Sequence, residues 1–359
     1  MNFRNRALGR FLSPILALLT SLTAPLAAAD EPAKLRIAVV ANSTSGTPVF
    51  VGPPQRLASD QEFQQALRQR NVELEWVPVS SAAVATLTNE AFTNRRIDFA
   101  FYGDLPSVIL NASGIKTRLL VPGNLGTNTY LAVPANSGAR SLQDLKGKRI
   151  ALHRGRPWEV SFAKLLEANG LGFNDFRIIN LNPQAGAAAL ASGGVEGFFT
   201  LDDAYVLEER GIAKVIWSSH QAPHDWKMRA ELWGSEEFIN RYPELTQLLA
   251  TATVRAMHWI SRDENRDEYI RLQARFGLPE TVIRRDADAN QVTWKDYWAP
   301  LFTDSLKKHY EQVAAHAHRN KLIRKSVEAA ELFASPGFVN RALQELGLEH
   351  YWNTAEAWQ

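Results

Sequence analysis

Cysteine is absent from the 359 residues of this chain, and its absence excludes several kinds of protein. Without cysteine there is no disulfide scaffold, no thiol nucleophile, no zinc–cysteine site and no N-terminal cysteine for lipid attachment. A strong excess of one charge is also missing, since 40 Lys+Arg stand against 38 Asp+Glu. This balance excludes a non-specific nucleic-acid binder that is held by phosphate electrostatics.

The chain begins with a pattern that is typical of a cleavable secretory signal over residues 1–29. Three arginines precede an apolar run at 11–26, and three alanines follow it at 27–29. The run is shorter than the ~20 residues that a membrane span needs, and two prolines interrupt it. Cleavage after Ala29 would leave 37 Lys+Arg against 38 Asp+Glu. We therefore expect a freely dissolved protein in a bacterial periplasm.

The rest of the chain favours two lobes, because a domain usually has ~100–200 residues. Apolar residues make up 45% of the chain, which is enough for packed cores and excludes a disordered protein. Apolar runs that are typical of fully covered strands alternate with helical periodicity. The predicted strands are residues 35–41, 72–79, 97–103, 118–121, 130–134, 149–153, 177–181, 195–201 and 214–217. This alternation predicts parallel α/β sheets, followed after about residue 238 by helices.

Four loops that follow predicted strands carry polar chemistry. In an open parallel sheet, ligands sit beyond the carboxyl ends of the strands, where helix N-termini present free N–H groups. The candidate ligand-binding residues in these loops are Ser45, Thr47, Ser80, Ser81, Tyr102, Gly103, Asp104, Arg154, Gly155, Arg156 and Trp158. Each loop is also compatible with an ordinary turn or a helix cap, and a cap at Ser81 or Asp104 would contribute about 1 kcal/mol.

Arg154 and Arg156 are the strongest of these candidates. The glycine between them lets the backbone approach an anion that either guanidinium can grip with two N–H groups. The alternative is a solvated charge pair with Glu159 or Glu167. The aromatic residues that could surround an organic tail are Tyr102, Trp158, Tyr205 and Trp226. A carboxylate, sulfonate, sulfate ester, nitrate or phosphate ester fits this chemistry, and the residues alone do not choose among them.

Three segments resemble periplasmic proteins that bind aliphatic sulfonates for ABC importers, within the wider sulfonate/nitrate/taurine group. Residues 94–107 (NRRIDFAFYGDLPS) resemble the family block G-x-I-D-F-x-x-x-G-D-x-P. Residues 141–151 (SLQDLKGKRIA) are similar to S-x-x-D-L-K-G-K-x-V-A, and residues 189–197 (ALASGGVEG) to A-L-x-x-G-x-V-D-A. The resemblance implies an α/β, two-lobe periplasmic binding protein of type II with a helical C-terminal extension.

The resemblance also implies how the chain works. Lobe 1 is expected to hold residues 30–129 and 227–359, and lobe 2 residues 130–226, with a hinge at the two crossings between them. An organosulfur oxyanion would be captured between the lobes and delivered to an inner-membrane ABC permease. Family contacts fall in the four loops and around Asp202, and Trp226 is a further candidate. We expect a monomer with no catalytic residue, metal or cofactor, and with no nucleic-acid partner.

The sequence departs from the family pattern in three places. LDDA at 201–204 replaces an aromatic-Asp-Pro element, RGRPW at 154–158 replaces K-G-S/T, and residues 47–56 differ from the usual first-helix opening. A ligand bulkier or differently charged than a short alkanesulfonate is therefore an open alternative, as are nitrate, choline sulfate and a thiamine-type precursor. The acidic residues that could hold a cationic part of the ligand are Asp104, Asp202, Asp203 and Asp225.

Signals for catalysis are weak. The chain has no G-x-S-x-G, H-E-x-x-H or P-loop motif. His316 and His318 are two residues apart on a predicted helix, so they face different directions and make a poor metal pair. His309 and His316 share a helix face, and we expect that face to be solvated. His220 and His224 are expected to form hydrogen bonds. A periplasmic enzyme or sensor built on the same lobes is the less favoured alternative.

Overall fold

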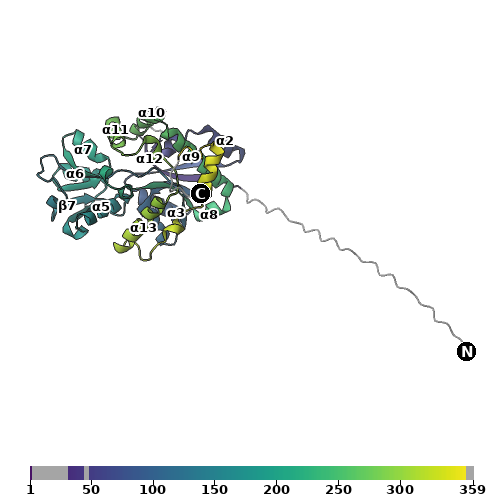
Figure 1. Cartoon of the computed structure of the whole chain (residues 1–359), viewed down its shortest axis with the longest axis horizontal. Coiled ribbons are helices and arrows are strands. Elements are labelled where there is room, and N and C mark those ends of the chain that lie inside the picture. Colours follow the sequence, from purple (N-terminus) through teal and green to yellow (C-terminus); the bar gives the residue numbers. More distant parts are fainter. Residues whose placement is uncertain (2–30, 44–47, 353–359) are drawn as a thin grey trace. The chain divides into compact units, whose positions relative to one another are not determined.

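Two mixed β-sheets organise the chain (Figure 1). The computed structural model describes residues 1, 31–43 and 48–352, and the residues from Glu31 onward form one compact unit. The predicted signal peptide and the candidate residues Ser45 and Thr47 lie outside the described residues. None of the helices in the described ranges has both the length and the apolar character that crossing a bilayer requires.

The first sheet combines the N-terminal strands with one strand that follows the second sheet in the sequence. Its strands are β1 (Lys34–Ser43), β2 (Pro48–Phe50), β3 (Glu73–Val79), β4 (Phe99–Gly103), β5 (Thr117–Val121) and β11 (Ala230–Ser235). β1 pairs in parallel with β3 and β4, as the apolar runs predict. β11 runs antiparallel between β4 and β5. The prediction of a parallel sheet is therefore wrong in part, because the chain enters β11 from the second sheet without a crossover helix.

The second sheet lies wholly within the middle of the sequence. Its strands, in spatial order, are β10 (Ala213–Ser218), β6 (Tyr130–Pro134), β9 (Gly197–Thr200), β7 (Arg149–Leu152) and β8 (Arg177–Asn180). β7 pairs in parallel with β8 and β9, whereas β6 is antiparallel to both of its neighbours. Because β7 and β9 are adjacent and parallel, the residues that follow them lie at the same edge of the sheet, about 5 Å apart in the pairing direction.

Helices cover these sheets and then fill the C-terminal region, which confirms the predicted α/β fold. The helices between strands are α1 (Pro53–Leu57), α2 (Gln61–Gln69), α3 (Val84–Thr93), α4 (Asp104–Ala112), α5 (Pro157–Ala168), α6 (Pro183–Ala191) and α7 (Asp203–Glu209). Those after β11 are α8 (Glu236–Arg241), α9 (Pro243–Ser261), α10 (Asp263–Ala274), α11 (Glu280–Asp288), α12 (Trp294–Tyr297), α13 (Asp304–Arg319) and α14 (Gly337–Leu346).

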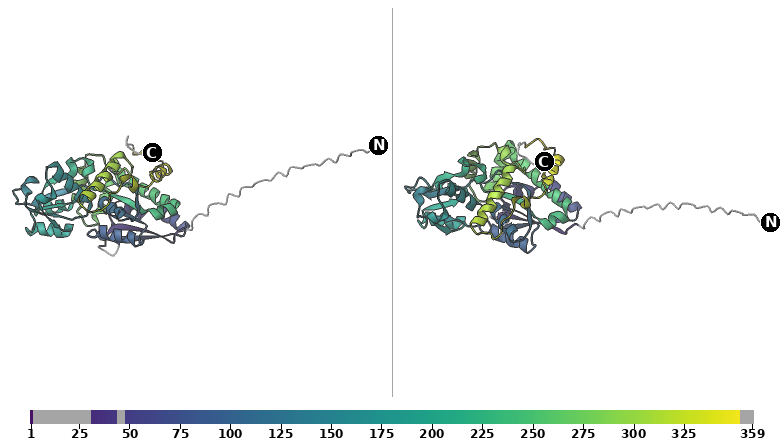
Figure 2. Two further views of the ribbon diagram at one scale, coloured as in Figure 1. Left: turned by 90° about the horizontal axis from the view of Figure 1, so that it is seen from below. Right: turned by 60° about the horizontal axis from the view of Figure 1, so that its bottom comes forward.

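Two C-terminal helices reach the layer of the second sheet. Val282 of α11 is buried in the apolar cluster that holds Tyr205 of α7, and the Arg285 guanidinium lies 3.7 Å from the centre of the Tyr205 ring. Yellow-green helices of the C-terminal region lie next to the teal elements in Figure 2, and Nε2 of His316 in α13 lies 3.5 Å from Oε1 of Glu159 in α5. The C-terminal region therefore contacts the helices that cover both sheets. The lobe boundaries given above stay a prediction.

Candidate functional site

The loops after β4 and β7 meet, although they belong to different sheets. Gly103 ends β4, and a Cβ placed on it would lie only 2.3 Å from Cγ of Pro157, the first residue of α5. Helices α4 and α5, which follow these two strands, are in contact. The close approach requires a glycine at position 103, since any side chain would collide with the proline ring. Two strand–helix junctions that the sequence placed in separate lobes thus form one site.

Arg156 is the most unusual residue at this site. It occupies the N-cap position of α5, it is only 7% exposed, and its guanidinium lies 5.0 Å from the centre of the Trp158 ring. Nη2 donates a hydrogen bond to the backbone oxygen of Ser81 at 3.2 Å, and the buried Nε has no partner among the described residues. Burial lowers the pKa of Arg156 to about 10. Among the described residues, no acidic side chain forms an ion pair with this guanidinium.

Arg154, by contrast, is neutralised by a carboxylate in the first turn of the helix that follows its loop. Its Nη2 lies 3.0 Å from Oε1 of Glu159, a fully buried carboxylate, and its guanidinium sits over the Phe173 ring at 4.6 Å. Oε2 of Glu159 accepts the Gly155 N–H at 2.5 Å, and the Arg154 N–H donates to Asn180 at 2.9 Å. Of the two acidic partners that the sequence left open for this arginine pair, the structure selects Glu159. Residues 153–156 (the α5 loop) therefore carry two guanidiniums and contact one carboxylate.

Asp104 is also fully buried, at the first position of α4. Its carboxylate accepts the N–H of Leu105 at 2.6 Å and the N–H of Arg229 at 3.0 Å, and Nε2 of His309 lies 2.7 Å from Oδ2. These contacts attach the start of α4 to the start of β11 and to α13. Asp104 thus has three partners within the protein.

The prediction that His309 and His316 lie on a solvated face is wrong, because each side chain is almost completely buried. Helix α13 packs this face against α4, and it places His309 beside Asp104 of α4 and His316 beside Glu159 of α5. Leu306, Tyr310 and Val313 lie on the same stripe of the helix and are buried with the two histidines. The spacing of these three apolar residues is visible in the sequence, and it could have indicated that both histidines are buried.

The remaining candidates do not all face the meeting point of the two junctions. Tyr102 packs in the first core between Phe92 and Trp233, with ring centres 5.9 and 6.3 Å away. The Trp158 ring is buried in the second core, and the half-buried Trp226 lies against Trp217. Ser80 is exposed, and its Oγ accepts the Ala82 N–H at 3.3 Å. The ligand-binding role of these four residues stays a prediction.

Asp202 follows β9 at the sheet edge that also carries the α5 loop. It takes the N-cap position of α7, but its side chain makes no capping hydrogen bond. Burial, followed by the charges of Asp286 and Asp203, raises the pKa of Asp202 well above its usual value. The carboxylate is therefore poorly stabilised in the folded protein, and its role in binding also stays a prediction.

The two chain crossings between the sheets are hydrogen-bonded to each other. Thr127 and Met228 pair through their backbones at 2.8 and 3.2 Å, and the Ser219 N–H donates to Thr129 at 3.0 Å. His220 forms hydrogen bonds, as expected: Nδ1 lies 3.2 Å from Ser218 Oγ, and Nε2 lies 3.1 Å from the backbone oxygen of Asp286. Sequence reasoning missed Asp286, because α11 reaches this region from the C-terminal part of the chain.

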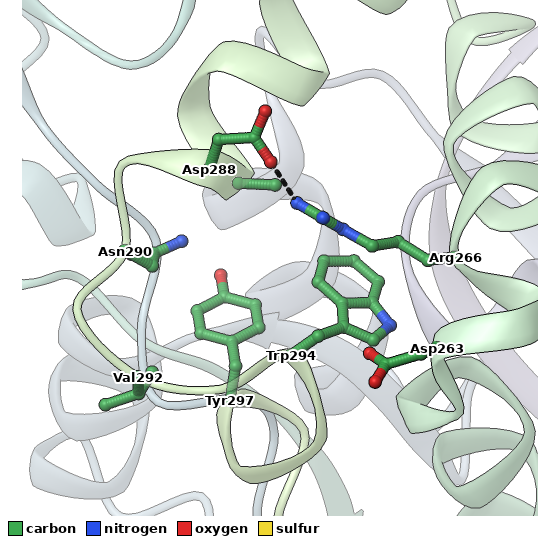
Figure 3. A pocket seen from close by; sticks show the side chains of 8 residues that line it. Asp263, Arg266, Asp288, Asn290, Val292, Trp294 and Tyr297 are labelled. Atoms are coloured by element: carbon green, nitrogen blue, oxygen red, sulfur yellow. Dashed lines mark hydrogen bonds and ion pairs between the residues drawn. The ribbon is translucent and has the colours of Figure 1, made fainter.

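A separate pocket of about 220 Å³ lies among the C-terminal helices (Figure 3). Arg266 pairs with Asp288 across it and covers the Trp294 ring at 5.1 Å. The Tyr297 hydroxyl donates to the backbone oxygen of Gly126. None of the predicted ligand-binding residues lines this pocket, so it is distinct from the site at the two junctions.

Comparisons with known proteins identify relatives of this chain. Residues 87–265 match the model of the family described as NMT1/THI5 like. The periplasmic sulfonate-binding protein SsuA from Methylobacillus flagellatus KT is 45% identical, with a TM-score of 0.82, over 90% of this chain and 97% of that structure. The alkanesulfonate-binding protein SsuA from Xanthomonas axonopodis pv. citri, bound to MOPS, is 22% identical, with a TM-score of 0.68, over 85% and 99%.

A curated relative from Bacillus subtilis (strain 168), named for binding aliphatic sulfonates, is 24% identical over 291 residues, which are 79% of this chain and 82% of that protein. The identity of 45% over nearly all of a solved relative establishes the family. The chain belongs to the periplasmic sulfonate-binding proteins of ABC importers.

Proposed function

We propose that this chain captures an organosulfur oxyanion, an alkanesulfonate or a sulfate ester, in the periplasm and delivers it to an inner-membrane ABC permease. The observation that carries the proposal is the buried Arg156 guanidinium, which has no acidic partner in the described chain. Burying an unpaired charge is unfavourable by several kcal/mol, so a guanidinium in this position favours an anionic ligand. The relatives named for sulfonates agree with that chemistry.

Closure of the two junctions completes the site. Arg156 belongs to the α5 loop of the second sheet, yet it donates to Ser81 next to the first sheet, and Gly103 touches Pro157. Separating the junctions would break these contacts and admit water. A ligand that neutralises Arg156 strengthens the closed arrangement, because it binds that form more tightly than the separated one. The closed form is the one that the permease receives.

Calorimetric titration of the mature chain with ethanesulfonate tests this function. Arg156→Gln removes the charge and its hydrogen bonds to the anion, so we expect the affinity to fall at least about tenfold. Arg177→Gln on the exposed edge strand β8 is the matched control and should bind like the wild type. If Arg156→Gln binds ethanesulfonate as tightly as the wild type does, the anion does not bind at Arg156. Recovery of chemically unaltered ethanesulfonate after incubation separates a carrier from an enzyme.

A further inference from the structure

The charges around the α5 loop do not cancel. Arg154 and Arg156 contribute two positive charges, and Glu159 contributes one negative charge. Glu159 pairs with Arg154, whereas Arg156 is left with a backbone oxygen. Among the described residues, Glu159 is the only carboxylate that forms an ion pair with either arginine, so one positive charge of the loop stays unpaired.

We propose that Glu159 is a specificity-determining residue, which restricts the site to ligands with a single negative charge. The inference rests on the proposed function and names the charge class of its ligand. A sulfonate or a sulfate monoester carries one charge and neutralises Arg156. Sulfate carries two negative charges. Arg154 cannot neutralise the second one, because its guanidinium is already paired with Glu159. In a site with little water, an uncompensated charge lowers affinity strongly.

Glu159 acts through the loop and needs no contact with the ligand. Its Oε2 accepts the Gly155 N–H, so the carboxylate fixes the loop backbone as well as the Arg154 side chain. Two histidines lie near these charges, His153 within the α5 loop and His316 beside Glu159. The pKa of His153 is lowered by burial and by Arg156, and His316 of α13 lies 3.5 Å from Glu159 Oε1. Because its pKa is lowered, His153 is neutral at pH 8, and binding is measured there. Lys164 is paired with Asp225.

Three variants change the charge of the loop by single steps. Glu159→Gln keeps an oxygen for the Gly155 N–H and raises the net charge by one, Arg154→Gln lowers it by one, and the double variant restores it. We expect the wild type to bind ethanesulfonate at least about tenfold more tightly than sulfate. Glu159→Gln should tighten sulfate binding about tenfold, and Arg154→Gln should weaken ethanesulfonate binding about tenfold. The double variant should return to within about threefold of the wild type for ethanesulfonate.

The double variant distinguishes charge from structure. If Glu159 only held the fold, or if Arg154 gripped the ligand directly, the double variant would bind ethanesulfonate as poorly as Arg154→Gln, and the inference would be overturned. An unchanged ratio of sulfate to ethanesulfonate affinity in Glu159→Gln would overturn it as well. The matched control is Glu167→Gln, which removes an exposed carboxylate from the same helix and should leave the ratio unaltered.

A second route leaves Glu159 in place. Asn180→Asp adds a negative charge beside the α5 loop and keeps the oxygen that accepts the Arg154 N–H. It should weaken ethanesulfonate binding about threefold, since the position is exposed and screened. No weakening would contradict the charge argument even if Glu159→Gln failed to fold. A wild-type chain that binds no sulfonate would instead refute the proposed function, so the two failures are distinguishable.

Discussion

The contact between Gly103 and Pro157 offers the sharpest test of closure. In Gly103→Ala the new methyl carbon would lie 2.3 Å from Pro157 Cγ and 3.3 Å from Cδ. Non-bonded carbon atoms pack at about 3.5–4.0 Å, so the start of α5 would have to move by more than about 1 Å. The proline ring is fixed to its backbone and cannot rotate away. Overpacking of this kind costs ~1–3 kcal/mol, so the dissociation constant for ethanesulfonate should rise ~5- to 150-fold.

Calorimetry with ethanesulfonate measures the effect, and thermal unfolding without ligand shows whether the fold itself suffers. Alanine tolerates the extended backbone of Gly103, at φ −78°, so a loss of affinity reports the collision with Pro157. The double variant Gly103→Ala/Pro157→Ala removes the colliding ring and should recover most of the affinity. Gly172→Ala is the control, because a Cβ there meets nothing within 4 Å. Wild-type affinity in Gly103→Ala would refute the reasoning, since the two junctions would then not approach each other around the ligand.

Two predictions concern buried charge. His309→Ala removes a partner of the buried Asp104 and should lower the free energy of unfolding by ~1–3 kcal/mol in urea titrations, with partial rescue by His309→Gln. Asp202 has a raised pKa in the folded protein, so its charge opposes folding as the pH rises above the unfolded value of ~3.9. Asp202→Asn should therefore stabilise the chain at pH 8 and not at pH 4, and a gain that is equal at both values would contradict this assignment.

Most strands were predictable because their apolar runs leave a local mark in the sequence, even where, as in β8, the strand lies at an exposed edge. The second sheet has every strand where an apolar run predicted one, and residues 130–134 match β6 throughout. β11 was missed, since residues 230–235 include a charged residue and a glycine and were interpreted as part of a chain crossing. Glu231 is nevertheless buried there, because Arg229 pairs with it. A buried charge of this kind is neutralised by a residue that is close to it in the folded protein, and the apolar pattern of the sequence does not indicate it.

The candidate site was predictable in its location and less so in its chemistry. The Arg-Gly-Arg spacing directed attention to the α5 loop. The strand order that brings Asp202 to the same sheet edge is known only from the structure. The sequence could not say which arginine is neutralised, because Glu159 and Glu167 were both available. The fold decides: Glu159 faces the loop from the first turn of α5, whereas Glu167 lies near the exposed end of the helix.

One late helix connects both junctions. Helix α13 places His309 against Asp104 at the start of α4 and His316 beside Glu159 in α5. The carboxylates that shape the two halves of the site therefore share a single support, which comes from far along the chain. A local sequence window around either carboxylate contains no sign of this support. Because α4 packs against α13 and Glu159 of α5 lies beside His316 of that helix, the separation of the two junctions depends on α13 as well as on the hydrogen-bonded crossings between the sheets.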